Sequence, residues 1–425
     1  MPPLPPQSNV HHAGGIRPRV AITGLGAVSA LGVGVPAFWG GLAGGRSGVG
    51  RLTILDEPSA ALIGAQAWDF HPPQYFSDAQ LELLDRFAQL AVVAAEEARR
   101  DAAFELPMAA PGRIGVAIGT AMGGATSDDR AYRGLYAEGR RTHPLTIPRI
   151  MYNAATSHVT MALGVHGPSL CISTACASGT QAIGEAAEMI RAGRADVMFA
   201  GGADAPLVGS VLKAWEAMRV LAPAGDDPAR ACRPFSRDRR GLVLGEGAGI
   251  VVLEDWAHAM RRGARVYAEL AGYGATADAR HITQPGLDAS ARAIGDALAQ
   301  AGLAIDEVGY INAHGSATRV NDATETNVIK QVFGDRARHL AVSSTKSMHG
   351  HAMGASGALE LIASVLAIVH GVIPPTANYT EPDPECDLDY VPNTARAMRV
   401  EAAISNSFAF GGLNAVLAVR RAGSD

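Results

Sequence analysis

Apolar residues recur along the chain in two patterns, short continuous runs and longer stretches at helical spacing. Helical spacing extends from Asp78 to Asp101, through the stretch that follows residue 177, and from about Gly354 onward. The continuous runs predict buried strands, which we place at residues 113–120, 169–174, 196–204, 249–255 and 308–316. Strands that alternate with amphipathic helices are typical of βαβ units, so we expect an α/β protein.

The stretch RVAITGLGAV, which begins at Arg19, predicts the first buried strand followed by a glycine-rich turn. Gly24 and Gly26 match only part of a dinucleotide-binding motif, because the third glycine spacing and the acidic partner are not convincing. We therefore do not favour a Rossmann site in this segment.

The second half of the chain repeats the layout of the first more loosely. The strand at 308–316 resembles the one at 113–120 in ending on glycine and small polar residues. Residues 404–419 predict two strands joined by a turn. We expect two βαβ-rich halves, 18–265 and 266–425, preceded by a disordered proline-rich tail at 1–17.

Composition narrows the class of protein. The chain has 425 residues, 48% of them hydrophobic, and its net charge of −5 without a long basic run does not support a nucleic-acid partner. Its four cysteines form no metal-like pair and no expected disulfide framework, so we expect a reducing, cytoplasmic compartment. The N-terminus lacks the apolar core of a signal peptide. The most apolar stretch, 359–373, contains Glu360 and His370 and is too short to span a bilayer, so we expect no membrane partner.

The segment TACASG, from Thr174 to Gly179, carries the strongest candidate for a nucleophile. A buried strand leads into it, a helix begins directly after it, and only small residues flank Cys176. The positive end of the helix would stabilise a thiolate and lower the pKa of Cys176, and backbone N–H groups of the turn could hold an oxyanion. A buried structural cysteine is the alternative, and it is the interpretation we favour for Cys171 inside the strand.

Three histidines follow apolar segments in the second half. His314 stands at the end of a predicted strand, where catalytic groups gather in α/β folds, although a structural role is commoner for such a residue. His349 and His351 precede the helix that starts near Gly354, where a neutral imidazole is favoured and could donate an N–H to a carbonyl or enolate oxygen. Helix capping is the alternative, and the residues alone do not show which of the two points inward.

Two further segments carry candidate supporting groups. Glu360 interrupts an otherwise apolar helix, and a buried carboxylate needs a partner, for which Lys346 is the natural candidate; a solvent-facing Glu360 is the alternative. Residues 407–412, SFAFGG, place Phe408 and Phe410 beside paired glycines between two strands. The two rings could shield a cavity, and a simple β-turn is the alternative.

Four motifs in this order, TACASG, NAHGSAT, KSMHGHAMGASGALE and NSFAFGGLN, resemble the elongating β-ketoacyl-[acyl carrier protein] synthases of the thiolase-like superfamily. The resemblance runs from about Val20 to Val419. It implies a duplicated five-layer α/β/α/β/α fold, a homodimer or a heterodimer with a chain-length-factor-like subunit, and an acyl carrier protein as partner. It implies no metal and no cofactor of the chain's own, because phosphopantetheine arrives on the carrier protein.

The resemblance also implies roles for individual residues. Cys176 matches the acylated nucleophile, and the pair that supports malonyl decarboxylation matches His314 and His351 rather than His349. Lys346 and Glu360 match the supporting ion pair of the family. The backbone N–H groups of Cys176 and Phe410 match the oxyanion hole, and the ring of Phe410 matches the aromatic gate. Substrate contacts match Met122, Trp215, Ser316, Thr318 and Phe408. Carrier-protein docking matches Arg140, Arg141 and Arg219, which by themselves would be solvated surface charges.

The implied reaction is a decarboxylative Claisen condensation of an acyl group on Cys176 with malonyl-[acyl carrier protein], in fatty acid or type II polyketide or polyene biosynthesis. Residues 205–223 look closer to ketosynthases of type II polyketide systems than to the housekeeping fatty-acid enzyme. A thiolase is disfavoured because no second cysteine lies near the final Gly-Gly, and an initiating synthase is disfavoured by His351. The alternative is a weakly or non-catalytic partner subunit that sets chain length, against which Cys176 is retained.

Overall fold

The structure is a computed structural model that describes residues 18–55 and 62–423. The tail predicted at 1–17 lies outside the described residues.

The first half builds five strands of a mixed sheet. Their spatial order is β6 (Ser169–Ile172), β5 (Ile114–Gly119), β7 (Val197–Asp204), β8 (Gly247–Asp255) and β1 (Val20–Ser29). β5 pairs in parallel with β6 and β7, whereas β8 pairs antiparallel with β7 and β1. The predicted strands therefore form, and β1, β5, β7 and β8 are buried on both faces over most of their length. The prediction that residues 169–174 form a buried strand was wrong in its burial, because β6 lies at the edge of the sheet and its residues are half-buried or exposed.

The second half builds the same arrangement again. Its order is β11 (Ala341–Ser343), β10 (Val308–Asn312), β14 (Ala402–Ala409), β15 (Leu413–Arg421) and β9 (Ala268–Ala277), with the same parallel and antiparallel pairings. The two sets of strands join where β1 meets β9, over the pairs Ala21–Glu269 and Ile22–Ala268. Short strands complete the set: β2 (Gly32–Val33), β3 (Gly50–Arg51), β4 (Ile63–Gly64), β12 (Val372–Ile373) and β13 (Arg396–Ala397).

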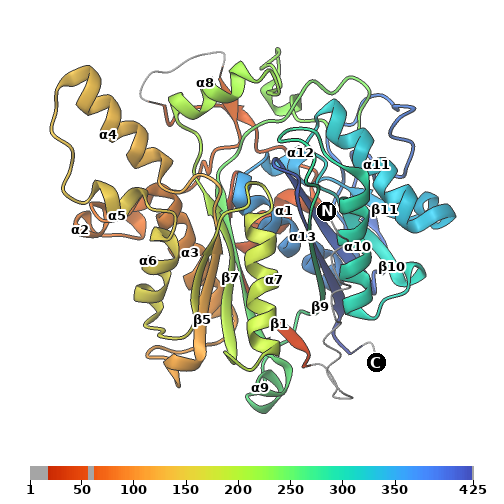
Figure 1. The fold of residues 1–425 in the computed structure, drawn as a ribbon, viewed down its shortest axis with the longest axis horizontal. Helices are drawn as coiled ribbons and strands as arrows, with labels where there is room; N and C mark the ends of the chain where they lie inside the picture. Colours follow the sequence, from red (N-terminus) through yellow and green to blue (C-terminus); the bar gives the residue numbers. More distant parts are fainter. Residues whose placement is uncertain (1–17, 56–61, 424–425) are drawn as a thin grey trace, which may run out of the picture.

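Helices form three layers around these strands (Figure 1). In the middle, α7 (Ser178–Arg191) and α13 (Ser356–His370) contact strands of both halves. On the outer faces, α3 (Arg86–Asp101) and α6 (Ala154–Leu163) cover the first half, and α10 (Leu287–Ala301) and α11 (Arg319–Phe333) cover the second. The predicted five-layer α/β/α/β/α fold is therefore present.

The remaining helices lie around the layers. They are α1 (Val35–Ala43), α2 (Asp78–Leu81), α4 (Ala125–Glu138), α5 (Thr146–Ile150), α8 (Gly209–Ala217), α9 (Trp256–Arg261) and α12 (Lys346–His349). Short 3₁₀ helices occupy Pro72–Gln74, Pro111–Arg113, Pro228–Arg230, Ile305–Glu307, Gly334–His339 and Met353–Ala355. The stretch Met353–His370 is long and apolar enough to cross a membrane, but 89% of it is buried, as expected for a core helix.

Two local predictions were wrong. The helix expected from 78 to 101 is two helices, because the Asp85 carboxylate accepts the N–H of Phe87 and starts α3 there. The turn expected after the first strand is absent, because β1 continues through Gly24 and Gly26 to Ser29. A Cβ atom at Gly26 would lie 1.9 Å from the carbonyl oxygen of Ala94, so this glycine lets α3 pack directly on the strand.

The starts of the two central helices approach each other through glycines. A Cβ atom at Gly179, in the first turn of α7, would lie 2.5 Å from the carbonyl oxygen of Gly354, just before α13. A Cβ atom at Gly202 in β7 would lie 2.3 Å from the same oxygen. Only glycine permits this contact, which places the segment that carries Cys176 beside the segment that carries His351.

Candidate active site

Cys176 lies in a tight turn between β6 and α7. The preceding residue, Ala175, has φ of +51°, a left-handed conformation that is costly for a residue with a side chain and concentrates at functional sites. Ala177 follows as the N-cap of α7, and the Cys176 side chain is 5% exposed. The small residues of TACASG therefore allow the sharp turn that was predicted, with the thiol at the start of the helix.

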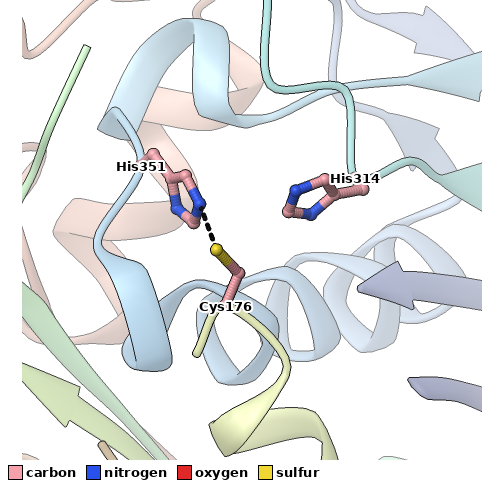
Figure 2. Close-up of side chains that lie close together, drawn as sticks. All are labelled: Cys176, His314 and His351. Carbon is pink, nitrogen blue, oxygen red and sulfur yellow. Dashed lines mark hydrogen bonds between the residues drawn. The ribbon is translucent and has the colours of Figure 1, made fainter. Parts of the chain in front are cut away.

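His351 is the direct partner of the thiol. Its Nε2 lies 3.0 Å from Cys176 Sγ, as the dashed line in Figure 2 shows. His314 comes from the end of β10 and faces the same sulfur from the other side, with its ring edge-on to His351 at a centroid distance of 5.5 Å. The structure therefore brings together the three residues that the motifs predict, although they are up to 175 positions apart in the sequence.

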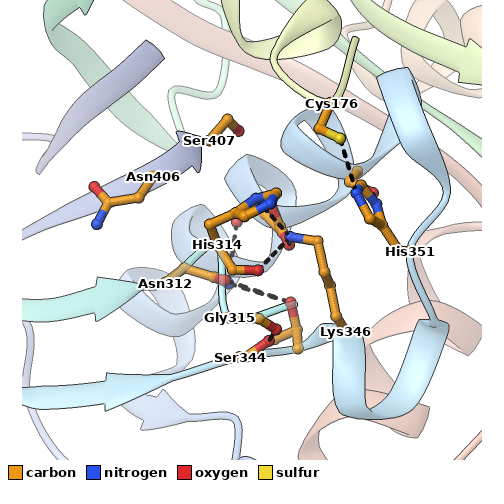
Figure 3. Close-up of polar contacts among 12 residues, drawn as sticks. Cys176, Asn312, His314, Gly315, Ser344, Lys346, His351, Asn406 and Ser407 are labelled. Carbon is orange, nitrogen blue, oxygen red and sulfur yellow. Dashed lines mark hydrogen bonds and ion pairs between the residues drawn. The ribbon is translucent and has the colours of Figure 1, made fainter. Parts of the chain in front are cut away.

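Lys346 lies beside His314 (Figure 3). The Lys346 Nζ donates to the His314 carbonyl oxygen at 2.7 Å and lies 3.3 Å from His314 Nδ1. The same ammonium pairs with the Glu360 carboxylate, and both side chains are fully buried. Burial raises the pKa of Glu360 to about 7, and Lys346 opposes that rise. Glu360 therefore faces the interior with the partner that the sequence suggests.

His349 lies away from the sulfur. Its Nε2 is 3.0 Å from Thr345 Oγ1, its ring centroid is 6.0 Å from that of Phe38, and its Nδ1 has no hydrogen-bond partner in the described part of the chain. The choice that the residues alone left open is therefore settled by geometry, since His351 points inward and His349 packs outside the site.

The protonation states differ in one respect from expectation. Burial, and then the Lys346 charge, lower the pKa values of His314 and His351 well below their usual range, so both imidazoles are neutral. Burial raises the pKa of the Cys176 thiol to about 11, despite opposing contributions from Lys346 and backbone N–H groups. The prediction of a lowered Cys176 pKa was therefore wrong in the net direction, because loss of hydration at the buried sulfur outweighs the groups that favour the thiolate.

Two backbone N–H groups converge on the sulfur. Those of Phe410 and of Cys176 itself lower the pKa of the thiol and so favour the thiolate. Phe410 directly follows β14, and its ring stacks on Trp215 at a centroid distance of 5.6 Å. The N–H groups predicted as oxyanion donors therefore lie beside the nucleophile, and the Phe410 ring, which is predicted to act as a gate, packs on the Trp215 ring of α8.

A cavity of about 640 Å³ leads to Cys176. Its lining includes most of the predicted substrate residues, namely Trp215, Ser316, Thr318 and Phe408, and also Arg219. Thr318 has a second role, because its Oγ1 accepts the N–H of Asn321 and caps α11. Met122 does not line this cavity, because hydrogen bonds to the Asp204 carboxylate hold its segment against the end of β7.

The predicted docking arginines separate into two places. Arg219 lines the cavity, whereas Arg140 and Arg141 follow α4 outside the lining, and Arg140 pairs with Glu138. Sequence reasoning missed Arg240 and Arg319, which are exposed, line the same cavity and have no side-chain hydrogen bond or ion pair among the described residues. The position of Arg319 directly after Thr318 was the available signal.

The thiol and the two imidazoles also form a possible metal-ligand set. The donor atoms of Cys176, His314 and His351 all lie within 4.8 Å of one another, and sulfur with two imidazole nitrogens suits zinc. The expectation that the site uses no metal stays a prediction.

Family models match most of the chain. A model for the N-terminal domain of β-ketoacyl synthases matches residues 17–259, and one for the C-terminal domain matches residues 267–380. Nodulation protein E of Rhizobium sp. (strain N33) is 48% identical over 405 residues, which cover 95% of this chain and 99% of that protein. The 3-oxoacyl-[acyl-carrier-protein] synthase 2 of Synechocystis sp. is 43% identical over 407 residues, which cover 95% of this chain and 98% of that protein.

Solved structures share the fold. The ishigamide ketosynthase/chain length factor superposes with a TM-score of 0.90 at 36% identity, over 96% of this chain and 100% of that one. A type II polyketide ketosynthase in complex with its acyl-carrier protein, bound to the hexaketide, gives a TM-score of 0.87 at 37% identity, over 96% and 100% of the two chains.

Proposed function

The chain belongs to the β-ketoacyl synthase family, and we propose that its cysteine–histidine site carries out the decarboxylative Claisen condensation of that family. The protein is a ketosynthase, an enzyme that transfers an acyl group and extends it with a malonyl unit. The observation that carries the residue assignment is the 3.0 Å contact of His351 Nε2 with Cys176 Sγ beneath two converging N–H groups.

The first half-reaction loads the enzyme. His351 Nε2 takes the proton of Cys176, and the sulfur attacks the carbonyl carbon of an acyl thioester. The N–H groups of Cys176 and Phe410 stabilise the oxyanion that forms, as preorganised donors do in a site from which water is excluded. Departure of the carrier thiol leaves the acyl group on Cys176.

The second half-reaction extends the chain. Malonyl-[acyl carrier protein] loses carbon dioxide, and neutral N–H donors on His314 and His351 stabilise the resulting enolate oxygen. The enolate carbon attacks the acyl carbon on Cys176, the bond from that carbon to Cys176 Sγ breaks, and the product leaves as a β-ketoacyl thioester of the carrier protein while Cys176 is freed as a thiolate. The proposed sequence has no step for a metal or redox cofactor, so EDTA should leave condensation unchanged.

Partners follow from the relatives. The enzyme receives its substrates from an acyl carrier protein and pairs with an identical or a chain-length-factor-like subunit. We propose that carrier docking uses Arg219, Arg240 and Arg319 around the cavity, with Arg140 and Arg141 as more distant contacts. We also propose a cytoplasmic location, which is supported by the free thiols of Cys171, Cys176, Cys232 and Cys386.

Acyl loading tests the nucleophile. After incubation with an acyl carrier thioester, intact-mass measurement should show one acyl group on the wild type and none on Cys176→Ala. Cys171→Ala is the matched control, because Cys171 is a half-buried thiol on β6, and it should load as the wild type does. Equal loading of Cys176→Ala, or no loading of any protein, would contradict the assignment.

Product formation separates the enzyme from the alternative partner subunit. With malonyl-[acyl carrier protein] added, the loaded wild type should release a β-ketoacyl product. A protein that loads but never condenses, even with a ketosynthase partner present, would instead be a subunit that sets chain length.

A further inference from the structure

Hydrogen bonding fixes the tautomer of one histidine in the site. Lys346 pairs with Glu360, and its ammonium lies 3.3 Å from His314 Nδ1. An ammonium has donors and no acceptor, so His314 Nδ1 accepts and its proton stands on Nε2. His314 is therefore a permanent N–H donor towards the substrate.

The other histidine has a different second partner. His351 Nδ1 lies 2.8 Å from the hydroxyl of Ser356, the first residue of α13, which is 1% exposed. No other hydrogen bond reaches that nitrogen within residues 18–55 and 62–423. A serine hydroxyl both donates and accepts, so this contact fits either tautomer of His351.

We propose that Ser356 is a positioning residue that holds the His351 ring on Cys176 and stabilises the charge His351 acquires during acyl transfer. The proposal rests on the proposed condensation and assigns its proton handling. With Nδ1–H donated to Ser356, Nε2 is free to accept the thiol proton across the observed 3.0 Å contact.

The proton follows a closed path. As the Cys176 S–H bond breaks, the proton goes to His351 Nε2, while the N–H on Nδ1 donates to Ser356 Oγ and the ring becomes an imidazolium. The thiolate forms a bond to the acyl carbon. When the adduct collapses, its bond to the phosphopantetheine sulfur breaks, and that departing thiolate takes the proton from Nε2. His351 returns to its neutral form, and because the Ser356 hydroxyl can also donate to Nδ1, the ring can then take the Nε2–H tautomer that donates to the enolate oxygen.

The hydrogen bond between Ser356 and His351 stabilises the charged ring more than the neutral ring, because hydrogen bonds to charged groups are stronger than those between neutral groups. Removing the hydroxyl therefore weakens proton transfer from Cys176 more than it weakens binding of the substrate. His314, His349 and Lys346 also face His351, and Asp204 faces Cys176, but these groups are unchanged by substitution of Ser356.

Alkylation of Cys176 by iodoacetamide, measured against pH, tests the proposal. Ser356→Ala should react about ten- to a hundredfold more slowly than the wild type near neutral pH. The gap should close at high pH, where the thiolate forms without help from His351. Acyl loading should fall in kcat by a similar factor, with KM for the acyl carrier thioester little changed.

Two further variants separate positioning from packing. Ser364→Ala is the matched control, because Ser364 is equally buried on α13 and its hydroxyl donates to the Glu360 carbonyl oxygen, not to a histidine. In Ser364→Ala, iodoacetamide should alkylate Cys176 at the wild-type rate. Ser356→Thr, which keeps a hydroxyl, should recover most of the wild-type alkylation rate. A folded Ser356→Ala with a normal pH profile, an equal loss in Ser364→Ala, or a Ser356→Thr as slow as the alanine variant would overturn the proposal.

These measurements distinguish loss of the proposed role of Ser356 from loss of the proposed condensation. If wild-type protein loads an acyl group and condenses it while Ser356→Ala does so equally well, only the role of Ser356 is lost. If the wild type neither loads nor condenses, the proposed function fails first.

Discussion

The two halves of the molecule share one arrangement of strands and differ in what precedes their central helices. Before α7 stands Cys176, flanked by small uncharged residues. Before α13 stands His351, with the buried Lys346–Glu360 pair close by. The ends of β5 and β10 differ in the same way, since Thr120 follows the first and His314 lies beyond the second.

This difference shows how a repeated fold can divide one reaction. The repeated arrangement places the starts of α7 and α13 in equivalent positions, and glycines allow these two helix starts to come into contact. Each half therefore needs to provide only part of the chemistry. In the proposed reaction, the first half provides the nucleophile, and the second half provides the groups that hold and move protons. Substitutions in either half should therefore have separable effects.

The largest effect should come from the histidine that faces the first half. His351→Ala should lower malonyl decarboxylation by about 10²- to 10⁴-fold, the range that a positioned acid–base group contributes. Carbon dioxide release from malonyl-[acyl carrier protein] measures it.

His349→Ala is the matched control, because His349 is equally buried two positions away but contacts Thr345 instead of the sulfur. It should retain decarboxylation within a fewfold of the wild type. Equal loss in both variants would mean that the second half contributes packing and no specific proton donor.

The next effect concerns the buried Lys346–Glu360 ion pair of the second half. Glu360→Ala leaves the Lys346 ammonium buried without its counter-ion, and breaking such a pair typically costs about 3–5 kcal/mol. Urea unfolding should show this loss, together with slower decarboxylation, because Lys346 also holds His314. Glu216→Ala, which breaks an exposed pair with Lys213, should leave the free energy of unfolding almost unchanged.

The sequence predicted the members of this site better than their physical state. Cys176 and His314 could be found because each follows a strand, and strand ends gather at one edge of an α/β sheet. The choice between His349 and His351 depends on how α12 and the next turn fold, which the residues alone do not determine. The raised pKa of Cys176 could not be predicted either, because burial arises from packing of both halves.

The same limit explains smaller errors. The Asp85 cap that divides the helix predicted at 78–101 also accepts the N–H of Ser127, a contact across 42 positions. Gly24 and Gly26 resembled a turn because their purpose, contact with α3, is visible only once that helix is in place. Local pattern therefore located the elements, and contacts between distant segments decided their ends.

A third prediction concerns Asp204, which lies at the end of strand β7, and compares that strand end with the end of β14. β7 ends in Asp204, whose carboxylate accepts N–H groups of Ala121, Met122 and Gly354, whereas β14 leads to the gate. Burial raises the pKa of Asp204 to about 6, so protonation of this carboxylate is more favourable in the folded protein than in the unfolded chain. This contribution to stability is complete below the unfolded pKa near 4 and is lost as the pH rises through 6.

Asp204→Asn removes that titration. The free energy of unfolding of the wild type, relative to the variant, should fall by about 3 kcal/mol over the whole range and by about 1 kcal/mol between pH 5 and pH 7. Asp322 and Glu360 titrate in the same region in both proteins, so they cancel in the difference. A constant difference across pH would show that the pKa of Asp204 is the same in the folded and the unfolded protein.

The smallest effects should arise where both halves contribute to the mouth of the cavity. Arg219 comes from the first half and Arg319 from the second, and both are exposed. Because rim charges act mainly on association, Arg219→Gln and Arg319→Gln should each raise KM for the carrier protein about two- to fivefold at low salt. The double variant should multiply the two, and high salt should reduce both. Arg140→Gln should change KM less, since Glu138 already neutralises that charge. A larger effect of Arg140→Gln than of Arg219→Gln would move the docking face from the shared mouth to the segment after α4, and carrier binding would then belong to the first half alone.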